Sequence, residues 1–265
     1  MGHTHQPIFI TGSVRTGTSI LTRALVDGAG IPGYAEGCIT DIFGSFVRMV
    51  DIKYARRSRE IAQGSIMLER IDQEKLKKSL AQWFKELYDA RIPFRGMWVD
   101  KTPDNDTVLA LPYLLQAWPD ATCIIMKRRP IENIASRLRK FPHLSFEQHC
   151  IALRDVLVNM QRACERLPKD RYLVLDQYDI ATKPQQTAKA IGIFLNLSIP
   201  QIEKMATIFE HRRPEFTGGD EQLLRSLEEM PWTPEQKTFF LDTFAELMPA
   251  FGWGLETTYY LEGTR

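Results

Sequence analysis

The stretch Ile8-Phe9-Ile10-Thr11-Gly12-Ser13-Val14-Arg15-Thr16-Gly17-Thr18-Ser19-Ile20-Leu21 decides the fold of this chain. A short apolar run leads into a turn bracketed by Gly12 and Gly17, and residues 19–26 are predicted to form a helix. Strand, glycine-rich turn and helix is the arrangement with which α/β proteins hold a phosphate, because the first N–H groups of the helix point at the anion. The glycines let the backbone approach the anion closely. Four side chains add donors: Arg15, Thr16, Thr18 and Ser19.

This turn departs from the P-loop of nucleotide triphosphatases at one decisive position. The P-loop pattern is G-x-x-x-x-G-K-[ST], and Thr18 stands where its lysine would be. That lysine reaches the β- and γ-phosphates, which an uncharged threonine cannot do. The only cation of the turn is Arg15, which comes earlier. The turn is therefore predicted to hold one phosphate rather than a triphosphate with magnesium, although a generic strand-turn-helix corner would look similar.

Composition places the chain among globular proteins. Its 265 residues are 44% hydrophobic and 25% charged, which suits one domain over residues 1–265 with a sizeable core. With 34 basic and 33 acidic residues the net charge is +1, which gives no electrostatic sign of nucleic-acid binding. No Asp or His cluster has the spacing of metal ligands, so we expect no metal.

Apolar runs alternate with helical patterns along most of the chain. Predicted strands cover residues 7–11, 96–99, 121–126 and 172–175. Predicted helices cover residues 107–118, 131–140, 146–167, 187–195, 199–209 and 233–247, the last with Thr233 as its N-cap. This order indicates an α/β fold: a P-loop-like three-layer sandwich with a mainly parallel central sheet and helices on both faces.

Three polar segments each follow a predicted strand. They are the turn after Thr11, Lys101 after Val99 and Arg128 after Met126. Ligands of open α/β sheets bind at the carboxyl ends of the strands. We therefore expect these segments to meet at one site.

A helical, strongly charged segment at about residues 41–92 interrupts the strand order. Two or three helices are expected, broken near Gly64, with a core face at Leu76, Leu80, Phe84 and Leu87. Arg56, Arg57 and Arg59 cluster with Lys53, either as a solvated face or as a rim that attracts an acidic acceptor.

Three motifs in this chain resemble those of sulfotransferases. Residues 13–19 are similar to the 5′-phosphosulfate loop, roughly P-[RK]-[ST]-G-T-[ST], and residues 128–136 to the 3′-phosphate motif R-[DN]-P-x-[DE]-x-x-x-S, from which Arg129 departs. Asp100-Lys101-Thr102-Pro103 is similar to the E-K-T-P stretch of bacterial and tyrosylprotein-type members. The resemblance runs from about Pro7 to Leu195.

This resemblance implies a reaction and a co-substrate. The chain would transfer a sulfuryl group from 3′-phosphoadenosine 5′-phosphosulfate (PAPS) to a hydroxyl acceptor, leaving 3′-phosphoadenosine 5′-phosphate (PAP). The cofactor-binding residues it implies are Arg15, Thr16, Gly17, Thr18, Ser19, Arg128 and Ser136. The catalytic residues it implies are Glu36 as the base, with Arg15 and Lys101 acting on the sulfuryl group. His143 is the alternative base, although it is expected on a surface turn.

Two further similarities are weaker. Gln177-Tyr178-Asp179-Ile180 resembles the Y-E-D-L stretch of the family and is interpreted as scaffold. Arg212-Arg213 with Gly218-Gly219-Asp220 faintly resembles a C-terminal loop of the family, but its register does not match, so no residues are assigned.

We expect the insert helices to form the acceptor pocket, for a small-molecule or carbohydrate hydroxyl.

Alternatives and location complete the expectations. A nucleotide-dependent kinase and a non-catalytic nucleotide-binding protein remain open, although the missing P-loop lysine counts against the first. The N-terminus lacks the features of a signal peptide, and no apolar run approaches the ~18 residues of a membrane span. The cysteines Cys38, Cys123, Cys150 and Cys164 form no C-x-x-C pair and suggest reduced thiols. We therefore expect a cytoplasmic protein of unknown oligomeric state.

Overall fold

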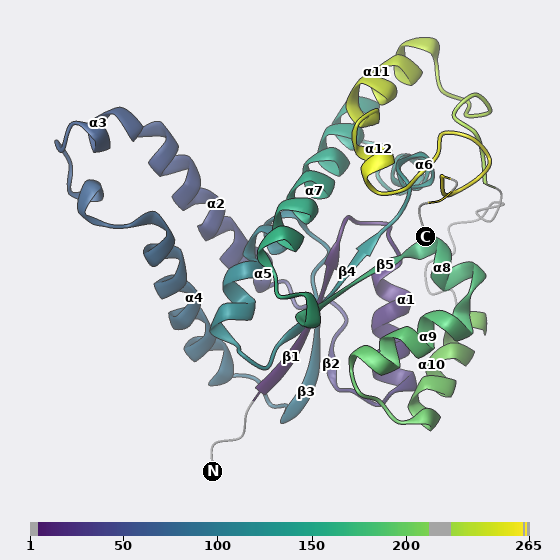
Figure 1. Ribbon diagram of the computed structural model, residues 1–265, viewed down its shortest axis with the longest axis horizontal. Helices are drawn as coiled ribbons and strands as arrows, with labels where there is room; N and C mark the ends of the chain where they lie inside the picture. The colour runs from purple at the N-terminus through teal and green to yellow at the C-terminus, as the bar shows by residue number, and fades with distance from the viewer. Residues whose placement is uncertain (1–4, 212–223, 262, 264–265) are drawn as a thin grey trace.

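A five-stranded parallel sheet forms the centre of the molecule. The computed structural model describes residues 5–211, 224–261 and 263. The strands are β1 (His5–Gly12), β2 (Gly33–Tyr34), β3 (Gly96–Lys101), β4 (Thr122–Lys127) and β5 (Tyr172–Asp176). They lie in the order β2-β3-β1-β4-β5, and every neighbouring pair is parallel (Figure 1). The predicted α/β class with a mainly parallel sheet is confirmed.

Side chains of alternate residues in the strands enter two separate cores. Phe9 and Trp98 pack on one face of the sheet, while Ile8, Ile10 and Val99 pack on the other. This period of two is what a strand buried on both faces requires. The first face is covered by helices that include α5 (Asn105–Ala117) and α7 (Phe146–Arg166). The second is covered by α1 (Thr18–Arg23), α9 (Pro184–Phe194) and α10 (Ile199–His211).

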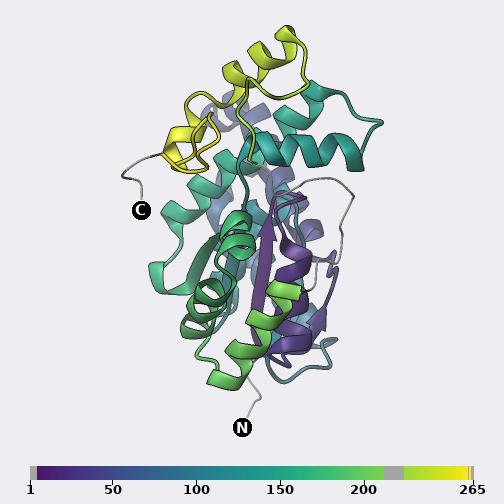
Figure 2. The same cartoon turned by 90° about the vertical axis from the view of Figure 1, so that its right-hand side faces the viewer.

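The carboxyl ends of the strands face a layer of later elements. Helix α6 (Pro130–Lys140) follows β4, and helix α8 (Gln177–Thr182) follows β5 directly. Figures 1 and 2 place α6 beyond the end of the sheet opposite the N-terminus, together with α11 (Pro234–Phe244) and α12 (Leu247–Ala250). Thr233 caps α11 as predicted, and its hydroxyl accepts from the Gln236 N–H.

The insert forms an arm that projects from the sheet (Figure 1). It contains α2 (Thr40–Arg56), α3 (Ser58–Ala62), a short 3₁₀ helix (Met67–Arg70) and α4 (Gln73–Asp89). The predicted break lies at Gly64, whose φ of 65° is left-handed. The expected helices and the break near Gly64 are therefore present, and the extent of the insert stays a prediction.

The predicted core face of α4 is wrong in part. The buried residues are Lys77, Ala81, Phe84 and Tyr88, whereas Leu87 is 46% exposed. Lys77 can be buried because its ammonium pairs with Asp51 and Glu74. A hydrophobicity pattern assigns a lysine such as Lys77 to the surface. The predicted core face of α4 is therefore rotated about the helix axis from the face that is buried.

Two other expectations meet mixed outcomes. In the described part of the chain no helix is both long and apolar enough to cross a bilayer, and a cytoplasmic location stays a prediction. All four cysteines are free: Cys123 and Cys150 are buried, Cys164 is half-buried and Cys38 is exposed. The weak similarity at residues 212–220 lies outside the described residues.

Candidate functional site

The turn after β1 has the backbone conformation that the sequence predicted. Gly12 and Gly17 have φ of 137° and 84°. A Cβ on Gly12 would lie 2.1 Å from the Met126 carbonyl oxygen of the neighbouring strand, so only glycine fits there. Arg15 is also left-handed, with a φ of 67°. Helix α1 begins at Thr18 and passes into one π-helical turn at Ala24–Gly28. The predicted helix over residues 19–26 is therefore present with altered geometry at its end.

The hydroxyl groups of the turn divide into two sets. Thr18 and Ser19 line a cavity in front of the turn, together with Arg15 and Gly17. Thr16 is buried, and its hydroxyl donates to the Ser13 carbonyl at 2.6 Å. The Thr16 side chain thus braces the turn instead of facing the cavity. The predicted role of the Thr16 hydroxyl as a donor to the phosphate is therefore not supported. The backbone N–H of Thr16 is a separate donor, and its predicted role is unaffected.

Lys101 and Glu36 come together at the cavity from different elements. Lys101 is the last residue of β3, and its side chain is 4% exposed, whereas Glu36 follows β2 and its side chain is 57% exposed. The Lys101 ammonium donates to the Glu36 carboxylate and lies 3.5 Å from the Ser19 hydroxyl. A lysine therefore reaches the turn from β3, although the turn itself has none. The predicted catalytic pair is brought together.

A buried carboxylate supports the segment that carries Glu36. Asp100 accepts hydrogen bonds from Tyr88 Oη and Thr102 Oγ1, and its burial raises the pKa of this carboxyl. A Cβ on Gly37 would lie 2.2 Å from Asp100 Oδ1, so glycine is required beside it. The Gly37 N–H also donates to the Lys101 carbonyl at 3.0 Å. These contacts fix the residue next to Glu36 and leave the Glu36 side chain exposed.

Helix α6 contacts the turn from behind. Its Asn133 amide donates to the Val14 carbonyl at 3.1 Å, and its Ser136 hydroxyl accepts from Arg15 Nε at 3.0 Å. At the end of β4, Arg128 Nη1 donates to the Arg15 carbonyl at 3.3 Å. The predicted residues of the two phosphate motifs therefore converge. Arg128 lines the cavity, whereas Ser136 is fully buried against Arg15 and does not.

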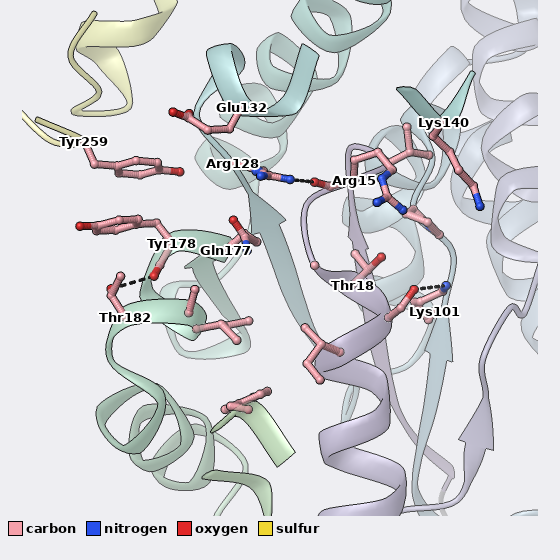
Figure 3. Close-up of a pocket in the computed structure, with 18 of the residues that line it drawn as sticks. Arg15, Thr18, Lys101, Arg128, Glu132, Lys140, Gln177, Tyr178, Thr182 and Tyr259 are labelled. Atoms are coloured by element: carbon pink, nitrogen blue, oxygen red, sulfur yellow. Dashed lines mark hydrogen bonds between the residues drawn. The ribbon is translucent and has the colours of Figure 1, made fainter. Parts of the chain in front are cut away.

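One cavity of about 400 Å³ joins these groups. Figure 3 shows Arg15, Lys101 and Lys140 on one side and Tyr178 with Tyr259 on the other. The two tyrosine rings stack at 4.2 Å between centroids with planes 10° apart. Its volume lies within the usual range for small-molecule sites, roughly 300–1,000 Å³. A cationic end and an aromatic end suit a ligand that carries anionic groups on an aromatic body.

Sequence reasoning missed the aromatic side of this cavity. Gln177, Tyr178, Ile180, Ala181 and Thr182 of α8 line the cavity, although this stretch was interpreted as scaffold alone. The rule that polar segments at strand ends meet at the site would have selected it, because α8 follows β5 directly. Tyr259 had no such signal, since it lies in the C-terminal segment and reaches the cavity only through long-range packing.

The C-terminal segment is held by buried charges at the ends of β4 and β5. Asp176 is fully buried and accepts from Tyr259 Oη at 2.5 Å and Trp253 Nε1 at 2.9 Å. Arg129 is 0% exposed, pairs with Glu132 and donates to backbone carbonyls of Gly254, Glu256, Thr258 and Arg225. Arg129, the departure from the family pattern, thus fixes the segment that carries Tyr259.

The remaining predictions place residues away from the cavity. His143 is exposed on a turn after α6, as expected, and does not line the cavity. The insert contributes no residue to this cavity, and the expectation that its helices form the acceptor pocket stays a prediction. They form much of a second, more apolar cavity of about 360 Å³, lined by Tyr34, Gly37, Ile39, Phe84, Leu87, Tyr88, Arg91 and Ile92.

The basic cluster of the insert and the metal prediction need only brief mention. Arg56, Arg57 and Arg59 are exposed on the arm, and Arg57 pairs with Glu60, which favours a solvated face. Within the described ranges, no group of three or more His, Cys, Asp or Glu side chains could hold a metal ion. Catalysis without a metal stays a prediction.

Comparisons with known proteins agree with this architecture. The model of the "Sulfotransferase family" matches residues 7–201, so the chain belongs to that family. Similar solved structures include a sulfotransferase from Mycobacterium avium, with 15% identity, a TM-score of 0.55 and coverage of 96% of this chain and 79% of that chain. The sulfotransferase domain of the Synechococcus PCC 7002 olefin synthase has 19% identity, a TM-score of 0.51 and coverage of 92% and 96%.

A third similar structure is a mouse sulfotransferase complexed with PAP, with 12% identity, a TM-score of 0.51 and coverage of 91% of this chain and 86% of that chain. At these identities the likenesses show the fold alone. No curated protein sequence matched the chain.

Proposed function

We propose that the protein transfers the sulfuryl group of PAPS to a hydroxyl acceptor, giving PAP and a sulfated product. One observation carries the proposal: the phosphate turn, the Lys101–Glu36 pair and Arg128 all border one cavity at the carboxyl end of the sheet. Membership of the sulfotransferase family supports it. PAP bound to a mouse protein of the same fold supports the choice of nucleotide.

The proposed mechanism assigns a role to each group at the cationic end. Glu36 accepts the proton of the acceptor hydroxyl, while the acceptor oxygen forms a bond to sulfur and the sulfur–oxygen bond to the 5′-phosphate breaks. Lys101 and Arg15 stabilise the charge on the sulfuryl oxygens and on the leaving phosphate oxygen. Because Lys101 donates to the Glu36 carboxylate, both groups lie at the same end of the cavity, and this contact would open to admit the acceptor oxygen.

The remaining residues would bind the nucleotide. Thr18 and Ser19, with the N–H groups at the start of α1, hold the 5′-phosphate. Arg128 and Ser136 hold the 3′-phosphate, and the Ser136 hydroxyl can donate to it while it accepts from Arg15 Nε. Gln177 and the stacked Tyr178 and Tyr259 provide the wall for the adenosine.

Titration calorimetry with PAP, ATP and AMP, followed by a sulfate-transfer assay from PAPS, tests this function. PAP is expected to bind more tightly than both other nucleotides, and transfer is expected to continue in excess EDTA. A preference for ATP with activity that magnesium restores would establish the kinase alternative instead. Binding of PAP without transfer to any of a panel of sugars, alcohols and phenols would favour the non-catalytic alternative.

A further inference from the structure

A buried cation lies behind the phosphate turn. Arg137 belongs to the last turn of α6 and is 7% exposed. Its Nη1 donates to the hydroxyl of Ser13, the residue that follows Gly12, at 2.8 Å. Neither Arg137 nor Ser13 lines the cavity. The guanidinium therefore stands one layer behind the surface that faces the ligand.

Within the described part of the chain, no carboxylate balances the charge of Arg137. None of the ion pairs among residues 5–211, 224–261 and 263 includes it. Its Nε has no hydrogen-bond partner within those residues. Burial lowers the pKa of Arg137 to about 10, and burial also lowers the pKa of the neighbouring His149, which favours the neutral imidazole. Burying a cation without a carboxylate strongly destabilises a fold.

We propose that Arg137 is a positioning residue whose missing counter-charge is the anion bound in front of the turn Gly12–Ser19. The inference rests on the proposed function only for the identity of that anion, the 5′-phosphosulfate end of PAPS. Ser13 and Arg137 are both buried, and electrostatic attraction between buried charges remains strong because little solvent screens it. The Ser13 hydroxyl that accepts from Arg137 also donates to the Val14 carbonyl at 3.2 Å, which links the cation to the turn.

Helix α6 contacts three successive residues of the turn, and its contact with Ser13 comes from a buried charged side chain, Arg137. Asn133 and Ser136 supply neutral groups to Val14 and Arg15. A neutral side chain at position 137 could brace Ser13 equally well, so bracing alone does not explain an arginine. The C-terminal end of a helix favours a cation, but this effect is small beside the desolvation of a buried charge.

The variant Arg137→Met distinguishes this role from simple bracing. We expect its affinity for PAP to fall about tenfold, within the usual range of coupling between sites, while the Tm of the unliganded protein stays equal or rises. Arg137→Lys, which keeps the charge, is expected to restore most of the affinity. The control is Arg154→Met on α7, which removes an exposed arginine and should change neither quantity.

Full-length variants are compared by calorimetry with PAP and by thermal unfolding with and without ligand. Equal affinity in Arg137→Met and the wild type overturns the proposal, as does a fall in Tm of the unliganded variant. If the wild type binds no PAP, the proposed donor fails, and inorganic pyrophosphate becomes the probe in the same assay. Greater stabilisation of the wild type than of Arg137→Met by pyrophosphate still supports the role of Arg137, and equal stabilisation overturns it.

Discussion

Two buried cations lie in different regions of the molecule and are treated in opposite ways. Lys77 in the projecting arm is 4% exposed, pairs with Asp51 at 2.8 Å and with Glu74, and lies 5.2 Å from the centroid of the Tyr113 ring. Arg137 behind the phosphate turn donates to a serine hydroxyl and takes part in no ion pair of the described residues. Burial opposes the charge at both sites, but hydrogen bonds that Lys77 donates to Asp51 and Glu74 raise its pKa, whereas the pKa of Arg137 is lowered to about 10.

The arm pairs its buried cation with carboxylates of its own, whereas the region behind the phosphate turn does not pair Arg137 with a carboxylate of the described residues. The arm neutralises its buried charge with its own carboxylates, so its stability needs no ligand. The carboxyl end of the sheet gathers Arg15, Arg128 and Lys101 around a cavity and places Arg137 behind it. Binding sites commonly hold such groups at some expense of stability, because function and not folding selects them.

The sharpest test of the cationic end concerns the exposed carboxylate of Glu36. We expect Glu36→Gln to lower kcat by about 10²–10⁴-fold, the usual contribution of a general base, because glutamine keeps the shape but cannot accept a proton. PAP affinity, measured by calorimetry, should change little. Comparable activity in Glu36→Gln would remove Glu36 from the mechanism, and His143→Ala would then test the histidine.

A second test concerns the buried arginine that does have partners. Arg129→Met leaves Glu132 and several backbone carbonyls without their donor, and breaking a buried pair of this kind costs about 3–5 kcal/mol. We expect a large fall in Tm and weaker PAP binding, because the same segment carries Tyr259. This is the opposite of the stability change expected for Arg137→Met. An unchanged Tm would show that the C-terminal segment is held by other contacts.

The contrast also explains what the sequence could predict. The phosphate turn, Lys101 and Arg128 follow strands directly, so local patterns place them at one edge of the sheet, and Glu36 was found through a family resemblance. Tyr259 and the Glu256 carbonyl come to Arg129 through packing across more than a hundred residues, which no local pattern encodes. Arg137 lies on a helix rich in basic residues, where nothing marks it as buried.

A third prediction concerns nucleotide choice at the cationic end. Charge-assisted contacts are worth about 1.5–3 kcal/mol, so Arg128→Ala should erase most of a roughly ten- to hundredfold preference for PAP over AMP. Calorimetry with both nucleotides measures this ratio. Arg154→Met is again the control for loss of a positive charge. Equal affinity of the wild type for PAP and AMP would contradict a 3′-phosphate site.

The arm provides the matched test of the comparison itself. Lys77→Met should lower the free energy of unfolding by about 1–3 kcal/mol. The loss is expected to be smaller than for a fully buried ion pair, because the Asp51 and Glu74 side chains are about half exposed. PAP affinity should not change, since the arm contributes nothing to the cavity. A fall in PAP affinity would show that the arm is coupled to the site. It would contradict the claim that the charges of the arm and of the site act independently.

The smallest expected effect is a pH dependence that originates next to Arg137. Burial, followed by the charge of Arg137, lowers the pKa of His149 below its ordinary value of about 6.5. The unfolded chain therefore binds a proton that the folded protein resists, so the contribution of His149 is fully present above pH of about 6.5 and is lost as the pH falls toward the folded pKa. The slope cannot exceed about 1.4 kcal/mol per pH unit for one proton.

We expect the Tm to decline less steeply between pH 7 and pH 5 in His149→Gln than in the wild type. Arg137→Met should also flatten the decline, because it removes the charge that opposes protonation of His149. Identical declines in all three proteins would mean that His149 does not titrate with folding and that its ring does not sense the charge of Arg137.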